Sequence, residues 1–302
     1  MLDYFILLRP TLFIPLWIFF LLGVHFAGSS ISGKSLLILL LYTLLMGGTY
    51  ILNQIVDMES DKKNEKLFLL SDGIIPLVHA YILMILLFFV PLIITFFMQL
   101  QIFVFFAIAL LMGITYSVPP LECKGKPFLD ILWNSAGYGM VTFSLGWIST
   151  TPLKTDMWIH TLPYFFAVAA VYVNSTILDI KGDKMAGKIT IGVFLGKKNT
   201  LLFAVILDII TLILAIIISD YLGVMAAGTA LPFFIYALVS RKKKPILLSI
   251  RGTFLILAII VGILFPIIIP VILFVFGIQK YYYRKKFHIN YPAVFSGVDK
   301  EF

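Results

Sequence analysis

Two groups of polar residues, far apart in the sequence, have the spacing needed to act together on one face of a helix. Asn53, Asp57 and Asp61 are four residues apart, and so are Asp179 and Asp183. Side chains with this spacing lie above one another on an α-helix. Two carboxylates and an amide in such a row form an oxygen-rich surface. This surface suits Mg²⁺, which proteins usually bind through one or two carboxylates together with substrate phosphates.

Acidic residues are scarce in this chain and are concentrated near these two groups. Of the 15 Asp and Glu residues, five fall in 57–72 and two in 179–183, which indicates function more than solubility. Lysines stand close to both groups. Paired aspartates beside lysines predict a bound anion that is bridged by metal. A diphosphate fits this arrangement, because metal ions neutralise its oxygens and lysine donors bind what remains.

The composition is that of a membrane protein. The 302 residues are 61% hydrophobic and 13% charged, with a mean hydropathy of +1.05. Apolar runs of about 18 residues recur. We therefore predict an all-α, polytopic membrane helical bundle that forms one integral-membrane domain over residues 1–302. The net charge of +8 does not indicate nucleic-acid binding, because the basic residues stand between the apolar runs. The single cysteine excludes an intrachain disulfide.

Nine transmembrane helices are predicted, the first of them retained rather than cleaved as a signal peptide. They cover residues 10–28, 35–55, 80–98, 101–116, 130–149, 158–178, 200–219, 222–240 and 252–278. Lys and Arg gather in the even-numbered connections, which places these loops and the N-terminus in the cytoplasm, or on the inner side of the cell membrane in a prokaryote. Pro266 and Pro270 interrupt the last run, so a broken helix pair that returns the basic tail to the cytoplasm is the alternative.

The positions of the two acidic groups suggest an internal repeat. Asp57 and Asp179 are 122 residues apart, and each follows the second span of a four-span group. Two four-helix halves plus a ninth helix around a central cavity would bring both groups to the cytoplasmic face. We expect Asp57 and Asp179 to face each other across this cavity.

Three motifs together resemble the UbiA-type intramembrane prenyltransferase family. They are N-x-x-x-D-x-x-x-D at 53–61, Y-S-x-P-P-x-x-x-K at 116–124 and D-x-x-G-D-x-x-x-G-K-x-T at 179–190. The L-L-R-P sequence at 7–10 agrees, and the resemblance covers nearly the whole chain. The chain departs from the family pattern at 64–73, which lacks an Arg-Pro pair that many members have. It also has Ser175 where some members carry a further acid.

The resemblance implies Mg²⁺-dependent transfer of a prenyl group from a polyprenyl diphosphate, through an allylic carbocation, to a lipid-soluble or aromatic acceptor. The implied metal ligands are Asn53, Asp57, Asp61, Asp179 and Asp183. The implied catalytic residues are these four aspartates and Tyr116. The implied substrate contacts are Arg9, Tyr116, Ser117, Lys124 and Lys188. Quinone precursors, tetrapyrroles and glycerol-phosphate lipids remain open as acceptors.

Other readings of the same residues are a transporter and a phosphate-transferring enzyme. A membrane transporter or cation channel could use the aspartates as cation ligands, but it would predict broken helices at matching positions near the midplane. The neighbouring lysines would also repel a cation. An enzyme that hydrolyses or transfers a lipid phosphate would not need an acceptor pocket, and the Y-S-x-P-P loop argues against it. Asp208, in the middle of a predicted span, is expected to form a structural hydrogen bond rather than to act in catalysis.

Overall fold

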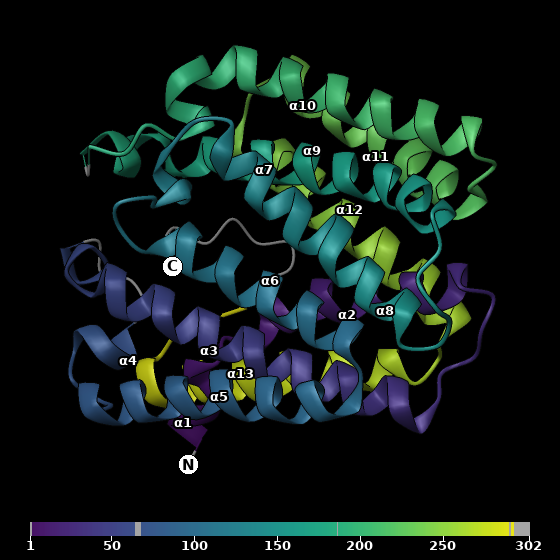
Figure 1. The fold of residues 1–302 in the computed structure, drawn as a ribbon. Coiled ribbons are helices and arrows are strands. Elements are labelled where there is room, and N and C mark those ends of the chain that lie inside the picture. Colours follow the sequence, from purple (N-terminus) through teal and green to yellow (C-terminus); the bar gives the residue numbers. More distant parts are fainter. Residues whose placement is uncertain (1, 64–67, 186, 290, 293–302) are drawn as a thin grey trace. The chain divides into compact units, whose positions relative to one another are not determined.

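The computed structural model describes residues 2–63, 68–185, 187–289 and 291–292, and all regular structure in these ranges is helical (Figure 1). The chain divides into two compact units. Unit 1 consists of Met1–Trp17, Ser32–Glu122 and Ile267–Phe302, and unit 2 consists of Ile18–Ile31 and Cys123–Pro266. The first acidic group therefore lies in unit 1 and the second in unit 2.

Seven helices are long and apolar enough to cross a membrane. They are α3 (Gly33–Lys63), α5 (Leu77–Met98), α6 (Leu100–Ser117), α9 (Asp156–Met185), α10 (Ile191–Ile217), α11 (Tyr221–Ser240) and α12 (Lys243–Leu264). A shorter apolar helix, α2 (Phe13–Phe26), follows the 3-10 turn η1 (Pro10–Leu12). The predicted spans between residues 35 and 116 and between 158 and 240 coincide with these helices. Hydropathy therefore located most of the helices correctly.

The run predicted at 130–149 is helical but not uniform. It consists of α7 (Leu129–Ser135), the π-helix η3 (Ala136–Thr142) and α8 (Phe143–Ile148). The Thr142 hydroxyl donates to the Gly137 carbonyl at 2.8 Å, five residues back. A Cβ on Gly139 would lie 2.6 Å from the Phe165 backbone nitrogen, so η3 packs tightly against α9. π-Helices are rare and short, and the hydrophobic pattern does not reveal this one.

The prediction of a single helix at 252–278 is wrong. Helix α12 ends at Leu264, and α13 begins four residues later and runs over Ile268–Phe287. Pro266 lies in the break. Proline has no N–H, and it disfavours helical backbone in the residue before it. Phe265 accordingly has φ −132° and ψ 77°. The broken pair is the alternative that the sequence left open.

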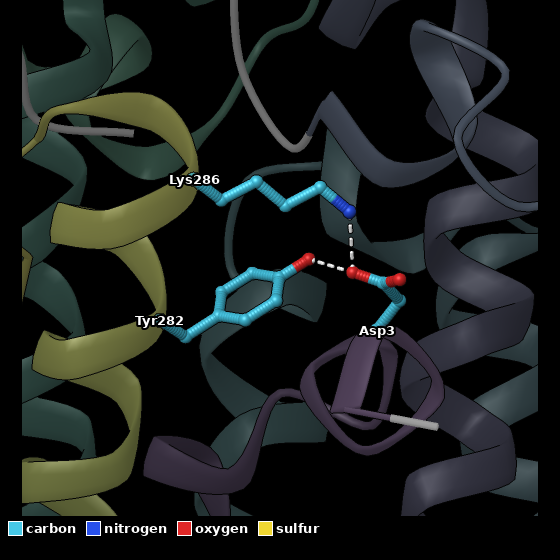
Figure 2. Close-up of polar contacts among 3 residues, drawn as sticks. All are labelled: Asp3, Tyr282 and Lys286. Carbon is cyan, nitrogen blue, oxygen red and sulfur yellow. Dashed lines mark hydrogen bonds and ion pairs between the residues drawn. The ribbon is translucent and has the colours of Figure 1, made fainter.

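The C-terminal end of α13 is joined to the N-terminal helix α1 (Leu2–Leu7) within unit 1. Figure 2 shows the Asp3 carboxylate accepting hydrogen bonds from the Tyr282 hydroxyl and, at 2.5 Å, from the Lys286 ammonium. Tyr282 also belongs to a hydrophobic core that includes Ile51, with Met58 packed against it. The basic end of α13 therefore lies with the N-terminus, at the end of α3 that carries the first acidic group.

Asp3→Asn is expected to lower thermal stability at neutral pH, and this deficit should disappear in acid. Hydrogen bonds from Lys286 and Tyr282 hold the pKa of Asp3 below its ordinary value of 3.8. A carboxyl whose pKa is lower in the folded state stabilises the fold at pH values above its ordinary pKa. This stabilisation is lost as the pH falls through the folded-state pKa. Because both charged side chains are 33% exposed, we expect the substitution to lower the free energy of unfolding by about 1 kcal/mol or less.

The measurement is the melting midpoint of detergent-solubilised protein at neutral pH and below about pH 3. The neighbouring Lys285 does not contact Asp3, and its ammonium bonds to Tyr281 instead. Lys285→Ala is therefore the control and should melt like the wild type at neutral pH. A deficit of Asp3→Asn that is equal at both pH values would contradict the assignment.

In unit 2, α9 and α10 position the second acidic group. The buried residues Ala169, Ala170 and Val173 of α9 share a core with Ala204 and Leu207 of α10. Small side chains allow membrane helices to approach closely. The two helices lie side by side (Figure 1), and the motif that begins at Asp179 occupies the last two turns of α9 and continues toward the start of α10.

Candidate active site

The first motif stands on an uninterrupted helix. Helix α3 extends to Lys63, so Asn53, Asp57 and Asp61 occupy three successive turns. The Asn53 side-chain nitrogen donates to Asp57 Oδ2 at 3.2 Å and to Ser117 Oγ at 3.3 Å. Asp57 and Asp61 are half-buried. The Asn53 amide thus connects the first motif to the last residue of α6.

A glycine contact explains why α6 lies near enough to α3 for this bond. A Cβ on Gly113 would lie 2.4 Å from the Thr49 Cγ2 atom, so a larger residue at this position would force Thr49 to shift. Gly113 is one turn before Ser117, and Thr49 is one turn before Asn53. The close contact therefore sets the distance between the two polar residues. Tyr116, beside Ser117, is half-buried at the same end of α6.

Arg9 lies beside a different face of α3 from Asn53. It lines a small cavity together with Gln54 and Gln279. Gln54 is one residue after Asn53, which places it about 100° further around the helix. The Gln54 amide also donates to the Leu7 carbonyl at 2.8 Å. Sequence reasoning missed this tie between α1 and α3, because an isolated glutamine in an apolar run does not indicate its partner.

The second motif closes on itself at the end of α9. Asp179 is exposed and Asp183 is half-buried. The Thr190 hydroxyl donates to Asp183 Oδ2 at 2.8 Å, and the Lys188 backbone N–H donates to the Asp183 carbonyl at 2.9 Å. Gly187 has φ +71°, a conformation that glycine adopts readily. The loop therefore folds back onto Asp183 and fixes its carboxylate.

Lys124 is buried, at 8% exposure, in the turn that precedes α7. The next residue, Gly125, accepts a hydrogen bond from the Ile189 N–H at 3.3 Å. Asp130 at the start of α7 is fully buried and accepts from the Ile191 N–H at 3.0 Å. The turn that carries Lys124 thus meets, within unit 2, the segment that follows the Asp179–Asp183 motif. Sequence reasoning missed Asp130, whose only signal is that it is a single acid at the start of an apolar run.

Two other acidic residues lie apart from these contacts. Glu59, between the aspartates of the first motif, is exposed. Asp208 is 2% exposed in α10, and its Oδ2 atom has no hydrogen-bond partner among the described residues. The structural hydrogen bond expected for Asp208 is therefore not found at that atom. The 64–67 segment, part of the stretch where the family pattern has an Arg-Pro pair, lies outside the described residues.

The carboxylates suit a metal that takes part of its coordination from the substrate. Among the residues that the structure describes, no group of three or more His, Cys, Asp or Glu side chains could hold a metal ion. Each motif contributes two aspartates on neighbouring turns. Mg²⁺ is usually bound by one or two carboxylates plus substrate phosphates and water. The donor set of each motif therefore fits Mg²⁺ in the presence of a diphosphate.

The fold and these motifs define a helical integral membrane protein with two aspartate motifs. The UbiA prenyltransferase family matches residues 16–245, which include both motifs, and the chain belongs to this family. A UbiA homolog from Archaeoglobus fulgidus, solved with GPP and Mg²⁺, has the same fold with a TM-score of 0.71. The two chains are 21% identical, and the match covers 86% of this chain and 97% of the other.

Two relatives of known name match with higher identity over shorter stretches. One is the chloroplastic 2-acyl-4-prenylphloroglucinol 6-prenyltransferase of Humulus lupulus, which is 28% identical over 179 residues, covering 56% of this chain and 43% of the relative. The other is the digeranylgeranylglyceryl phosphate synthase of Sulfolobus acidocaldarius, which is 29% identical over 199 residues, covering 65% of each chain. The matches span less than two thirds of the length of these relatives.

Proposed function

We propose that this protein is a Mg²⁺-dependent prenyltransferase of the membrane. It would transfer a prenyl group from a polyprenyl diphosphate to a lipid-soluble or aromatic acceptor. The main support is that a polar neighbour orients one aspartate in each motif. The Asn53 amide donates to Asp57, and the Thr190 hydroxyl donates to Asp183. Family membership supports the reaction class. The names of the two relatives refer to a phloroglucinol and to a glyceryl phosphate, which keeps both acceptor classes in the proposal.

In this proposal, both motifs bind one diphosphate. The metal ligands would be Asn53, Asp57, Asp61, Asp179 and Asp183. When bound, Mg²⁺ supplies positive charge that stabilises the diphosphate as a leaving group.

The remaining site residues would orient the substrates. Lys124 and Lys188 would donate to diphosphate oxygens. The burial of Lys124 supports this role, because an ammonium in a dry site acts more strongly on an anion than one in water. Tyr116 would place an aromatic ring near the allylic cation, whose charge its face attracts. Ser117 would orient Asn53 through their hydrogen bond, and Arg9 would contact substrate from the neighbouring face of α3.

For the architecture, we propose two four-helix halves plus a ninth helix around a central cavity. The nine crossings would be the seven long helices, α2 and the run from α7 to α8. Helix α13 would then cross once more and return the basic tail to the cytoplasmic side, where the active site would open. The contact of Lys286 with Asp3 supports this return, and so does the excess of positive residues expected on the inner side.

Single cysteines at Lys184, Arg241 and Lys285 are expected to resist an impermeant thiol reagent added to intact cells. A cysteine at Lys154 should react, because it lies in an odd-numbered connection. All four positions are exposed, so burial does not explain a negative result. The native Cys123 is 2% exposed, and burial raises the pKa of its thiol, which keeps the background low.

Disruption of the cells before labelling provides the control, since all four cysteines should then react. External labelling at Lys184 or Arg241 would contradict a cytoplasmic site. External labelling at Lys285 alone would show that the tail does not return.

The proposed function is tested by identifying the product. Membranes that contain the protein are supplied with prenyl diphosphates of several lengths and with quinone-precursor, tetrapyrrole and glycerol-phosphate acceptors. Mass spectrometry should detect an acceptor in which a prenyl group replaces one hydrogen, together with released diphosphate. Hydrolysis of the diphosphate without any prenylated acceptor, or metal transport by the same membranes, would refute the proposal.

A further inference from the structure

The Asp130 carboxylate connects two segments that are distant in the sequence. Its Oδ1 atom accepts a hydrogen bond from the Ile131 N–H at 2.8 Å, and its Oδ2 atom accepts one from the Ile191 N–H at 3.0 Å. The side chain is 0% exposed. One buried carboxylate therefore ties the first turn of α7 to the first residue of α10, 61 positions later.

The segment that Asp130 holds also carries the contacts of the second motif. Ile191 follows Thr190, whose hydroxyl donates to Asp183 Oδ2 at 2.8 Å. Two residues before Ile191, the Ile189 N–H donates to the carbonyl of Gly125 at 3.3 Å, and Gly125 is next to Lys124. The hydrogen bond from the Ile191 N–H to Asp130 is thus one residue away from Thr190, which holds Asp183. Helix α7, which carries Asp130, begins just after the Lys124 turn.

The start of α10 has little freedom to move independently of this bond. A Cβ on Gly192 would lie 2.7 Å from the Thr176 hydroxyl oxygen, so α10 contacts α9 closely at this point. Thr176 precedes Asp179 by less than one turn. A buried carboxylate is costly unless its oxygens are hydrogen-bonded, and the N-terminus of a long helix favours negative charge. The two N–H donors and the end of α10 therefore stabilise Asp130 in this one place.

We propose that Asp130 is a positioning residue that keeps Thr190 against Asp183 and the Lys124 turn beside the same loop, so that the second motif is preformed for a metal-bound diphosphate. Asp130 does not touch the substrate in this scheme, since backbone N–H groups occupy both of its oxygens. The inference rests on the proposed function for the identity of the ligand. It requires that residues 188–191 are held in place before any ligand arrives.

Asp130→Asn is the test variant, because it preserves shape but replaces one acceptor with an amide nitrogen. Hydrogen exchange of the purified protein should show faster exchange in peptides that contain Ile189 and Ile191. Binding of Mg²⁺ together with inorganic diphosphate is measured from the rise in melting temperature that it causes. The variant should need about 10-fold to 100-fold more Mg²⁺ than the wild type, as is typical when a residue behind a metal ligand is replaced. In a prenyl-transfer assay, KM for the diphosphate should rise more than kcat falls.

Asp208→Asn is the matched control, because it changes a buried carboxyl in the same unit that belongs to neither motif. Its hydrogen exchange at Ile189 and Ile191 should match that of the wild type. Its Mg²⁺ requirement should also be unchanged. Wild-type exchange and wild-type Mg²⁺ requirement in Asp130→Asn would overturn the proposal. If the wild type transfers no prenyl group, the proposed function fails, whereas the exchange and Mg²⁺–diphosphate measurements still decide the role of Asp130.

Thr190→Val is the second variant and covers the case in which Asp130→Asn does not fold. It removes only the hydroxyl that donates to Asp183 and keeps the hydrogen bond from the Ile191 N–H to Asp130. We expect a raised Mg²⁺ requirement with normal exchange at Ile191. Thr211→Val, which removes a buried hydroxyl elsewhere on α10, should have a normal Mg²⁺ requirement. An unchanged Mg²⁺ requirement in Thr190→Val would show that the Thr190–Asp183 contact does not prepare the site, and would overturn the proposal.

Discussion

Replacing Asp57 or Asp183 with alanine is expected to slow prenyl transfer at least about 100-fold, while the protein still inserts and folds. Each change removes a carboxylate ligand, so metal is bound more weakly and the remaining acids repel the diphosphate. The magnitude is estimated from the loss of one group that stabilises developing negative charge at an active site. The measurement is the rate of formation of the prenylated acceptor at saturating diphosphate, together with elution as a single species in detergent.

The double variant Asp57→Ala/Asp183→Ala distinguishes a shared site from two separate ones. Groups that act as one unit give non-additive losses, so we expect the double variant to be about as slow as the slower single variant. Chelation by EDTA should silence the wild type, and added Mg²⁺ should restore it. Asp208→Asn should retain most of the activity, because Asp208 belongs to neither motif. Full transfer by Asp57→Ala, or transfer that continues unchanged without divalent metal, would rule out the mechanism.

Gly146→Val is expected to have the largest effect on stability. A Cβ on Gly146 of α8 would lie 1.9 Å from the Phe20 carbonyl oxygen of α2, and a Cβ on Gly23 of α2 would lie 1.9 Å from the Phe143 carbonyl oxygen. The two glycines thus form a reciprocal contact in which each helix meets the backbone of the other. Small residues at such contacts are a principal means of holding membrane helices together.

Because backbone atoms are the obstacle, no change of side-chain rotamer relieves the overlap, and the helices must separate. Overpacking typically costs about 1–3 kcal/mol, and we expect Gly146→Val to reach the upper end of this range or to prevent folding. The measurement is the yield of monodisperse protein and its melting midpoint in detergent. Gly277→Val is the matched control, since a Cβ there would meet no atom within 4 Å. Equal melting of Gly146→Val and Gly277→Val would contradict the packing argument.

Local sequence properties determined the class of the protein and most of its helices. Apolar runs long enough to cross a bilayer predicted α3, α5, α6 and the helices from α9 to α11, because hydropathy and length act within one segment. The spacing of Asn53, Asp57 and Asp61 predicted a row of polar side chains, because the helical period is fixed. The resemblance carried by the three motifs led to the UbiA family, which the family match over residues 16–245 confirms.

The tertiary structure decided which distant residues meet. Asp130 and Ile191 are 61 positions apart, and Asp3 and Lys286 are 283 positions apart. No local pattern pairs such residues, because each pair is brought together by the packing of helices whose apolar faces look alike in the sequence. The π-helix η3 depends in the same way on neighbours that only the folded chain supplies. Local sequence patterns therefore predicted most of the helices, whereas helix packing specified the contacts that orient each motif.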